Sequence, residues 1–273
     1  MLEIKDLHVE IAGNPVLRGV SLAIEPGETF ALFGPNGSGK TTLLMTLMGF
    51  GEYRITGGSI RFKGRDITHA PMYERARLGI GMSFQRPPTI HGLSVRNLLG
   101  LCAGKERRVD PEALAGRVNF GRFLDRDVND GFSGGEIKRS EMLQLMAQEP
   151  DLLLFDEPES GVDIENMALI GRTAKELLGG GVEGGGCCPS RQLAKTGKSG
   201  LIITHTGYIL EYVNADRGQV MYEGRLCCEA KPLDILEQVR KSGYRECLRC
   251  FMDDAGSDGL PAKAMERQEV RHA

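Results

Sequence analysis

The sequence lacks several features that would place it in one of the large classes of proteins. No stretch approaches the roughly 18 uncharged apolar residues of a membrane span, and the opening segment, MLEIKDLHVE, lacks the apolar region of a secretory signal. The formal net charge is only -3, which does not give the strongly basic surface of a nucleic-acid-binding protein. Seven cysteines, an odd number in a long chain, indicate reduced thiols rather than a disulfide framework. We therefore expect a cytoplasmic protein with no direct membrane insertion and no nucleic-acid partner.

The distribution of apolar residues predicts an α/β fold. Of the 273 residues, 41% are hydrophobic and 26% charged, as in an ordinary soluble globular protein with a sizeable core. Over the first 65 residues apolar and polar positions alternate, which is typical of antiparallel strands. Three short apolar runs, TFALF, LLLF before Asp156 and LIIT before His205, predict buried strands of one parallel sheet.

Two stretches interrupt the predicted sheet. From Arg86 to Glu149 the apolar spacing is mostly helical, which predicts an inserted helical subdomain. Six glycines within 179–186, followed by a small and polar stretch, indicate an inserted loop. We therefore expect a single domain over 1–273, divided into a catalytic core at 1–84 and 150–230, a helical subdomain at 85–149, a glycine-rich insertion at 179–200 and a polar tail at 254–273.

A glycine-rich segment between a predicted strand and a predicted helix has the spacing of a phosphate-binding P-loop. Glycines let backbone N–H groups curl around phosphates, and the helix that begins at Lys40 adds the positive end of its dipole. Lys40 is expected to neutralise the terminal phosphates and Thr41 to coordinate Mg²⁺. The predicted nucleotide-binding residues are Gly34, Pro35, Asn36, Gly37, Ser38, Gly39, Lys40, Thr41 and Thr42.

Two adjacent carboxylates end the LLLF strand. Neighbouring acids at the carboxyl end of a strand can divide the work of phosphoryl transfer between metal binding and activation of water. Asp156 is therefore expected to hold Mg²⁺, and Glu157 to polarise the attacking water. Taken alone, the pair could equally be two solvated acids.

The segment Phe132 to Glu136, FSGGE, is a glycine-bearing helix start with no phosphate-binding lysine of its own. Ser133 and Glu136 have the spacing of a helix-capping box. The segment also resembles the signature motif of the ABC ATPase family. That resemblance implies that Ser133, Gly134, Gly135 and Glu136 of one protomer grip the γ-phosphate held by the P-loop of another, so that two protomers form an ATP sandwich dimer.

Three further residues fall where the ABC resemblance needs them, and the resemblance covers about Leu2 to Gly224. Gln85 matches the Q-loop glutamine that reaches Mg²⁺ and water, Asp163 matches the D-loop that communicates across the dimer, and His205 matches the switch histidine. The resemblance implies ATP and Mg²⁺ as ligands and a RecA-like parallel-sheet core, with an N-terminal antiparallel β subdomain and an inserted helical subdomain. It also implies the following roles: catalysis by Glu157, His205 and Gln85, and metal binding by Thr41, Gln85 and Asp156.

The expected adenine site departs from the family pattern. Transporter ATPases usually stack adenine on an aromatic residue near the first strands, whereas the segment VEIAGNPV offers only Val9, Ile11 or Val16. We therefore expect an apolar and weaker contact to the base.

Within the family, the sequence is most similar to the SufC ATPases of the SUF iron–sulfur cluster assembly machinery. The phrases that carry this resemblance are LEIKDLHVEI, RITGGSIRFKGRDIT, MSFQRPP, GFSGGEIKRSEMLQ and SGVDIENM, together with Glu159, where transporters usually have Thr. Pro158, the short region between Gln85 and Ser133, and the insertion depart from that pattern. The resemblance implies a SufB/SufD-like scaffold protein as partner, docked on the helical subdomain near Gln85.

Two other classes compete with this interpretation. The nucleotide-binding subunit of an ABC membrane transporter would dock on a permease through the same surface, so the sequence leaves that alternative open. A soluble ABC protein of the DNA-repair or ribosome-associated type would usually carry long coiled-coil inserts or fused tandem domains, and the sequence has neither.

Six of the cysteines form three close pairs. A closed metal site normally needs four ligands, and no single pair supplies them, so incidental free thiols are the favoured interpretation over a metal or cluster site. The pairs are Cys187 and Cys188 in the insertion, Cys227 and Cys228 after the last predicted strand, and Cys247 and Cys250.

Overall fold

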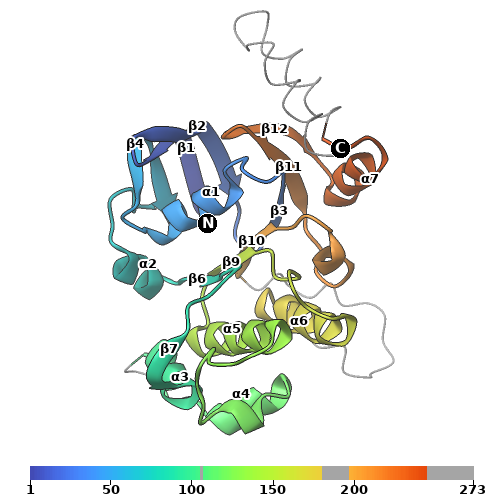
Figure 1. Ribbon diagram of the computed structural model, residues 1–273. Helices are drawn as coiled ribbons and strands as arrows, with labels where there is room; N and C mark the ends of the chain where they lie inside the picture. Colours follow the sequence, from blue (N-terminus) through green and yellow to red (C-terminus); the bar gives the residue numbers. More distant parts are fainter. Residues whose placement is uncertain (105–106, 180–196, 245–273) are drawn as a thin grey trace, which may run out of the picture.

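The fold is built from a six-stranded sheet, a four-stranded sheet and a group of helices, as the computed structural model shows (Figure 1). The structure describes residues 1–104, 107–179 and 197–244. The polar tail, most of the glycine-rich insertion, and Cys187, Cys188, Cys247 and Cys250 lie outside these ranges. None of the described helices is long and apolar enough to cross a membrane.

The N-terminal sheet is antiparallel and has the order β2-β1-β4-β5. Its strands are β1 (Leu2–Ile11), β2 (Asn14–Ile24), β4 (Tyr53–Phe62) and β5 (Arg65–Asp66). Buried and exposed positions alternate along much of β2 and β4, because one face of the sheet packs on the core and the other is solvated. This confirms the antiparallel subdomain expected from the first 65 residues.

The central sheet has the order β12-β11-β3-β10-β9-β6, and its strands are parallel except for the edge strand β12. Its strands are β3 (Thr29–Phe33), β6 (Ile80–Ser83), β9 (Leu152–Asp156), β10 (Ser199–Ile203), β11 (Arg217–Tyr222) and β12 (Arg225–Ala230). Every residue of β3, β6, β9 and β10 is buried, because both faces of this sheet are covered. The sheet brings the carboxyl ends of β3, β6, β9 and β10 to one edge.

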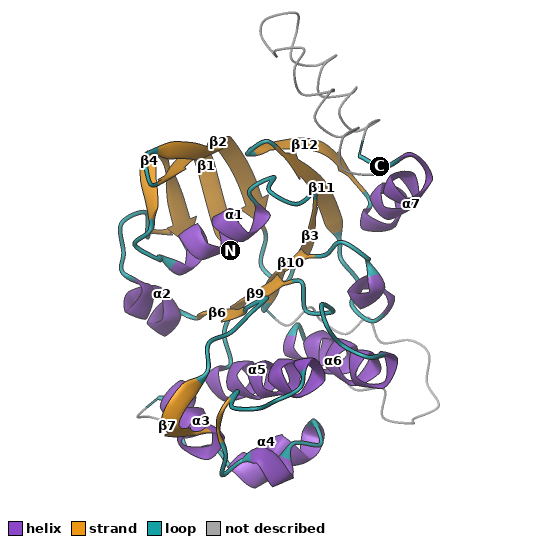
Figure 2. Cartoon of the chain, in the orientation of Figure 1, coloured by secondary structure: helices purple, strands orange, loops and turns teal. Residues whose placement is uncertain are grey.

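Helices cover the two faces of the central sheet (Figure 2). On one face, Phe33 and Phe155 pack with apolar residues of the helical region and of α6. On the other, Phe30 and Leu154 pack with α1 and the antiparallel sheet. The helices are α1 (Lys40–Met48), α2 (Met72–Leu78), α3 (Val95–Ala103), α4 (Pro111–Arg117), α5 (Gly134–Gln148), α6 (Ile164–Leu177) and α7 (Pro232–Ser242), with 3-10 turns at Gly121–Phe123 and Tyr208–Glu211.

The P-loop helix α1 is anchored at its far end by Arg75 of α2, which is only 2% exposed. Its guanidinium donates to the carbonyl oxygens of Thr46 (2.7 Å) and Leu47 (3.0 Å) in the last turn of α1. A cation at this end of a helix complements both the unpaired carbonyls and the helix dipole. The helix itself ends at Gly49, which adopts the left-handed conformation.

Three local features differ from the expectations. The region 86–149 also holds a small sheet of β7 (Ile90–Ser94) and β8 (Asp127–Val128), which was missed because β8 has two residues and β7 is largely exposed. Cys227 and Cys228 lie within β12 rather than after the last strand, and an irregular register between β11 and β12 hides the alternation there. Strand β10 begins at Ser199, inside the range assigned to the insertion.

Candidate functional site

The predicted P-loop joins the carboxyl end of β3 to the amino end of α1. Gly34, Gly37 and Gly39 have φ values of 149°, 79° and 107°, which L-residues with a side chain rarely adopt. Lys40 turns back into the loop, where its Nζ donates to the carbonyl oxygens of Gly34 (2.8 Å) and Pro35 (3.0 Å). Burial lowers the pKa of Lys40, while the nearby carboxylates of Glu157 and Asp156 act in the opposite direction. The loop therefore holds a cation at its centre, close to two acids.

Asp156, the last residue of β9, is fully buried beside the first turn of α1. The Thr41 hydroxyl donates to its Oδ1 over 3.4 Å, and its Oδ2 has no hydrogen-bond partner among the described residues. Burial raises the pKa of Asp156 to about 6. A buried carboxylate oxygen without a partner is costly, and carboxylate and hydroxyl oxygens are ligands that Mg²⁺ prefers. These residues fit a Mg²⁺ site.

Glu157 follows directly, and its two carboxylate oxygens face different partners. The amide of Gln85 donates to Oε2 over 2.7 Å, and the imidazole Nε2 of His205 pairs with Oε1. The three residues follow β6, β9 and β10, which are neighbours in the central sheet. Glu157 has φ of 49°, an uncommon conformation for a residue with a side chain, held by its N–H donating to the Ile203 carbonyl (3.1 Å). Local strain of this kind is typical of functional sites.

The P-loop and this acidic group share a pocket of about 440 Å³, lined by Val16, Asn36, Gly37, Gly39, Lys40, Thr41, Thr42, Gln85 and Glu157. Of the three apolar residues considered for the base, only Val16 lines it. Val9 is completely buried in β1 and Ile11 is not among the lining residues. Val16 is therefore the one of the three candidates that remains for an apolar contact to adenine. Val9 points into the core because side chains alternate between the two faces of a strand.

The signature segment starts α5 and packs against the D-loop of the same chain. Ser133 and Glu136 form the reciprocal capping box that their spacing indicated. A side chain at Gly134 would collide with the Gly161 carbonyl oxygen, 2.3 Å from the position of its Cβ, and one at Gly135 would meet Asn166. Asp163 caps α6 by accepting from the Asn166 N–H at 2.9 Å. The glycines therefore allow a close approach that a side chain would prevent.

The structure does not bring all the predicted residues into one place. None of Ser133, Gly134, Gly135, Glu136 and Asp163 is among the described residues that line the P-loop pocket. Direct contacts join Gln85 and His205 to Glu157, and Thr41 to Asp156. Lys40 lines the same pocket as Thr41, Gln85 and Glu157.

Sequence reasoning missed a buried ion pair in α5. The side chains of Lys138 and Glu141 are 2% and 3% exposed, and Lys138 Nζ lies 3.1 Å from Glu141 Oε2. Glu141 accepts from the Phe84 N–H (2.5 Å) and the Ser83 hydroxyl (3.1 Å), and the Lys138 ammonium donates to the Phe84 carbonyl. Burial raises the pKa of Glu141, and Lys138 counteracts it. The pair fixes Phe84, the residue before Gln85, to the signature helix. The sequence could have indicated this pair, because Lys138 and Glu141 lie on the same helix face as the apolar residues Met142 and Leu145.

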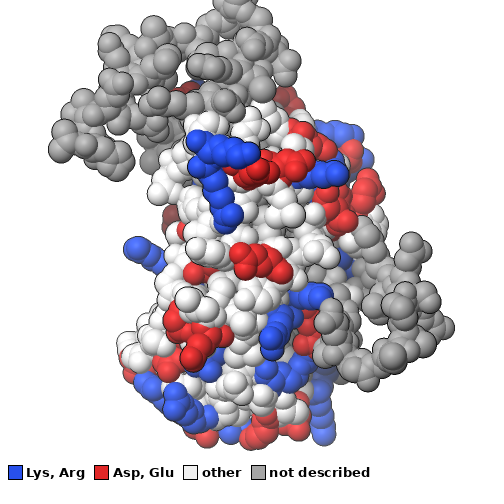
Figure 3. All heavy atoms as spheres, turned by 90° about the vertical axis from the view of Figure 1, so that its right-hand side faces the viewer, with Lys and Arg blue, Asp and Glu red and all other residues white. Residues whose placement is uncertain are grey.

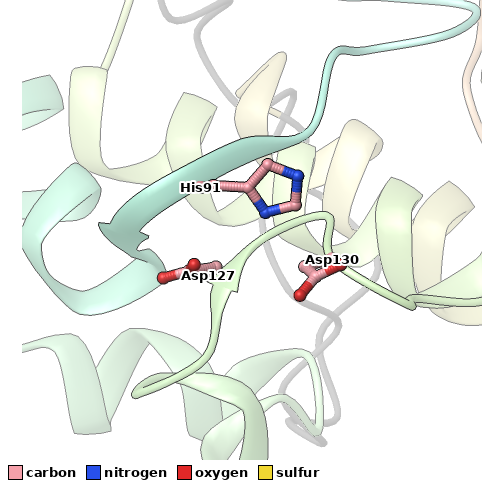
Figure 4. A group of neighbouring side chains, drawn as sticks. All are labelled: His91, Asp127 and Asp130. Carbon is pink, nitrogen blue, oxygen red and sulfur yellow. The ribbon is translucent and has the colours of Figure 1, made fainter.

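A further group of possible metal ligands lies in the helical region (Figure 4), and none of its members lines the P-loop pocket. Ligand atoms of His91 on β7, Asp127 on β8 and Asp130 in the next turn lie within 4.8 Å of one another. His91 and Asp130 are exposed, and Asp127 accepts a hydrogen bond from the Gly92 N–H (2.8 Å). Exposed carboxylates commonly gather without a metal, so we assign this group no role.

The surface seen in Figure 3 carries basic and acidic side chains intermingled, with no large patch of one sign on that face.

Comparison with known proteins gives a consistent result. The family model described as "ABC transporter" matches residues 17–160. The chain is 35% identical over 258 residues to the "Probable ATP-dependent transporter SufC" of Escherichia coli, covering 89% of this chain and 97% of that protein. It is 34% identical to an uncharacterized ABC transporter ATP-binding protein of Methanocaldococcus jannaschii, covering 92% of this chain and 95% of that protein.

Solved structures show the same fold. A nucleotide-free ATP-binding cassette from an ABC transporter matches with a TM-score of 0.69 and 22% identity, covering 91% of this chain and 98% of that one. An ATP-binding subunit of an ABC transporter matches with a TM-score of 0.69 and 24% identity over the same shares of both chains.

Fold, P-loop and family model together define an ABC-type ATPase, an enzyme that hydrolyses ATP to ADP and phosphate. Within the ABC ATPases, the chain belongs to the SufC family.

Proposed function

We propose that ATP binds with its phosphates in the P-loop, against the residues Gly34 to Thr42 that the sequence singled out. The Lys40 ammonium donates to two carbonyl oxygens of the loop. When nucleotide binds, it would donate to phosphate oxygens in their place. Thr41, Asp156 and Gln85 would hold Mg²⁺, and the buried Asp156 oxygen without a partner supports this. When bound, Mg²⁺ neutralises charge that develops on the phosphates.

Hydrolysis in this proposal depends on Glu157. A water molecule attacks the γ-phosphorus, the bond from that phosphorus to the bridging oxygen of ADP breaks, and Glu157 takes up a proton of the water. Gln85 and His205 orient the carboxylate from either side, and the family resemblance implies that His205 also hydrogen-bonds the γ-phosphate. The convergence of both side chains on Glu157 is the observation that carries this proposal.

The site is proposed to be completed by a second copy of the chain. Ser133, Gly134, Gly135 and Glu136 do not line the P-loop pocket of their own protomer, although an amino-terminal helix end is suited to a phosphate. In an ATP sandwich dimer these residues would face the γ-phosphate of the partner, and Asp163 would lie at the junction.

The biological role that we propose is iron–sulfur cluster assembly in the cytoplasm, on a SufB/SufD-like scaffold protein. Its support is the similarity to SufC over most of both chains, together with Glu159. The scaffold would dock on the helical subdomain near Gln85, so that closure of two protomers on ATP reshapes it. A second candidate is the nucleotide-binding subunit of a membrane transporter, favoured by Pro158 and by the word "transporter" in the names of the relatives.

A pull-down of the tagged protein from native cytosol and membranes, under iron-replete and iron-limited growth, separates the two roles. The proposal predicts recovery of a SufB-like protein, more strongly when iron is limiting. Recovery of a polytopic permease at stoichiometric yield, with no SufB-like protein, would replace it with the transporter role.

A further inference from the structure

Glu159, two residues after Glu157, contacts the residues on both sides of His205. One of its carboxylate oxygens, Oε1, accepts hydrogen bonds from the hydroxyls of Thr204 and Thr206, the latter at 3.2 Å. The histidine proposed to orient Glu157 is therefore flanked by two residues that are bound to one carboxylate.

The same two hydroxyls also hold the backbone that follows His205. Thr204 Oγ1 accepts from the Gly207 N–H at 2.8 Å, and Thr206 Oγ1 accepts from the Tyr208 N–H at 3.3 Å. Each hydroxyl donates to Glu159 while accepting from the backbone, so one carboxylate oxygen organises the whole segment 204–208.

Glu159 and Glu157 share one turn, in which the Ser160 N–H donates to the Glu157 carbonyl oxygen at 3.0 Å. Placing the Glu159 carboxyl group here costs folding free energy, because burial raises its pKa. Its Oε2 also has no hydrogen-bond partner among the described residues. Hydrogen bonds from Thr204 and Thr206 offset this cost in part. A half-buried acid beside the proposed reacting group is therefore expected to have a use there.

We propose that Glu159 is a positioning residue, which fixes the segment 204–208 and so holds the His205 imidazole against Glu157. The inference rests on the proposed roles of Glu157 and His205. Glu159 does not line the P-loop pocket; it lines a separate pocket of about 490 Å³ together with Glu157 and His205. Its loss should therefore slow the chemical step and leave ATP binding nearly unchanged.

The test compares Glu159→Ala, Glu159→Gln and Thr206→Val by steady-state ATPase kinetics. Without the carboxylate the histidine is free to move, and a misplacement of about 1 Å in an active site can cost about 100-fold. We expect Glu159→Ala to lower kcat by about 10- to 100-fold with KM within about threefold. The Gln variant retains an oxygen that accepts from both hydroxyls, so its kcat should stay within about threefold.

Two comparisons separate positioning from general destabilisation. Glu211→Ala alters an exposed acid that lines the same pocket, and its kcat should stay within about twofold. Adding Thr206→Val to Glu159→Ala should lower kcat little further, because both changes remove the same contact. If Glu159→Ala does not fold, Thr206→Val decides the question, with an expected loss of about three- to tenfold in kcat.

Three results would overturn the inference: an unchanged kcat in folded Glu159→Ala, a Gln variant as slow as the Ala variant, or an unchanged kcat in Thr206→Val. His205→Ala serves as the reference for the proposed function itself. If His205→Ala is slow and Glu159→Ala is not, only the positioning role fails. If His205→Ala turns over normally, the role of His205 in hydrolysis fails as well.

Discussion

The side-chain amide of Gln85 lies 2.7 Å from Glu157 Oε2, although the two residues are 72 positions apart in the chain. Their strands, β6 and β9, are parallel neighbours in register, Ser83 facing Phe155. Because the two parallel strands end on the same side of the sheet, the glutamine that follows β6 meets the acid that follows β9. The contact joins the carboxyl end of β9 to the segment that leads from β6 into the helical region.

Replacing Glu157 by Gln tests the proposed base. The substitution keeps the shape of the side chain and removes the proton acceptor, so turnover should fall by about 10² to 10⁴, or roughly 3 to 5 kcal/mol of barrier. ATP binding, measured by equilibrium titration, should survive. Near-normal hydrolysis by this variant would remove Glu157 from the role.

Replacing Asp156 by Asn should abolish turnover and yet stabilise the metal-free protein. The pKa of Asp156 is raised to about 6 by burial, above the 3.8 of the free side chain, so its ionised form disfavours folding at pH 7. We expect the free energy of unfolding in urea with EDTA to rise by about 1 to 3 kcal/mol. The gain should shrink as the pH falls from 7.5 towards 5, where the folded wild-type protein is protonated at this position.

The exposed Asp130, changed to Asn, serves as the matched control and should leave stability nearly unchanged. A lower stability of Asp156→Asn than of the wild type under these conditions would contradict the assignment of Asp156 as a buried acid that awaits a cation.

The buried pair of Lys138 and Glu141 should show strong coupling. Removing one partner leaves the other charge buried and unpaired, which typically costs about 3 to 5 kcal/mol, whereas removing both is milder. In urea unfolding, Lys138→Met and Glu141→Leu should each be strongly destabilising, and the double variant should lose less than their sum. Additive losses would show that the two charges act independently.

Most of the features that could be predicted from the sequence depend on local patterns of residues. Strand β3, the P-loop and α1 could be predicted because they follow one another directly in the sequence. The glycines of the loop allow its backbone to curl around phosphates. The resemblance to the ABC family assigned Gln85 and His205 to the site of Glu157, and the neighbouring parallel strands β6, β9 and β10 bring the three residues together at their carboxyl ends.

The rest depended on contacts that no local pattern contains. Lys138 and Glu141 appear in the sequence as ordinary helical charges, and only the packing of α5 against Ser83 and Phe84 makes them buried. The close approach of Gly134 to Gly161 is equally invisible, because the sequence offers the capping box as a sufficient reason for that segment.

The glycine-rich insertion is expected to lie away from catalysis. Helix α6 ends at Leu177, and β10 begins at Ser199 opposite Leu152, the first residue of β9, whereas Asp156 and His205 lie at the other ends of these strands. Deleting residues 180–196 should therefore leave kcat within a few-fold of the wild type. Loss of ATP binding in a folded deletion variant would contradict this placement.

The composite ATP site is the central claim, and sedimentation velocity of the slow Glu157→Gln variant tests it most directly. With ATP and Mg²⁺ the variant should sediment as a dimer, and without nucleotide as a monomer. Adding Ser133→Arg should leave ATP binding intact but keep the protein monomeric, because the charged side chain blocks the face that meets the partner's nucleotide. A Glu157→Gln protein that stays monomeric with saturating ATP, or one that dimerises equally well with Ser133→Arg, would contradict the account.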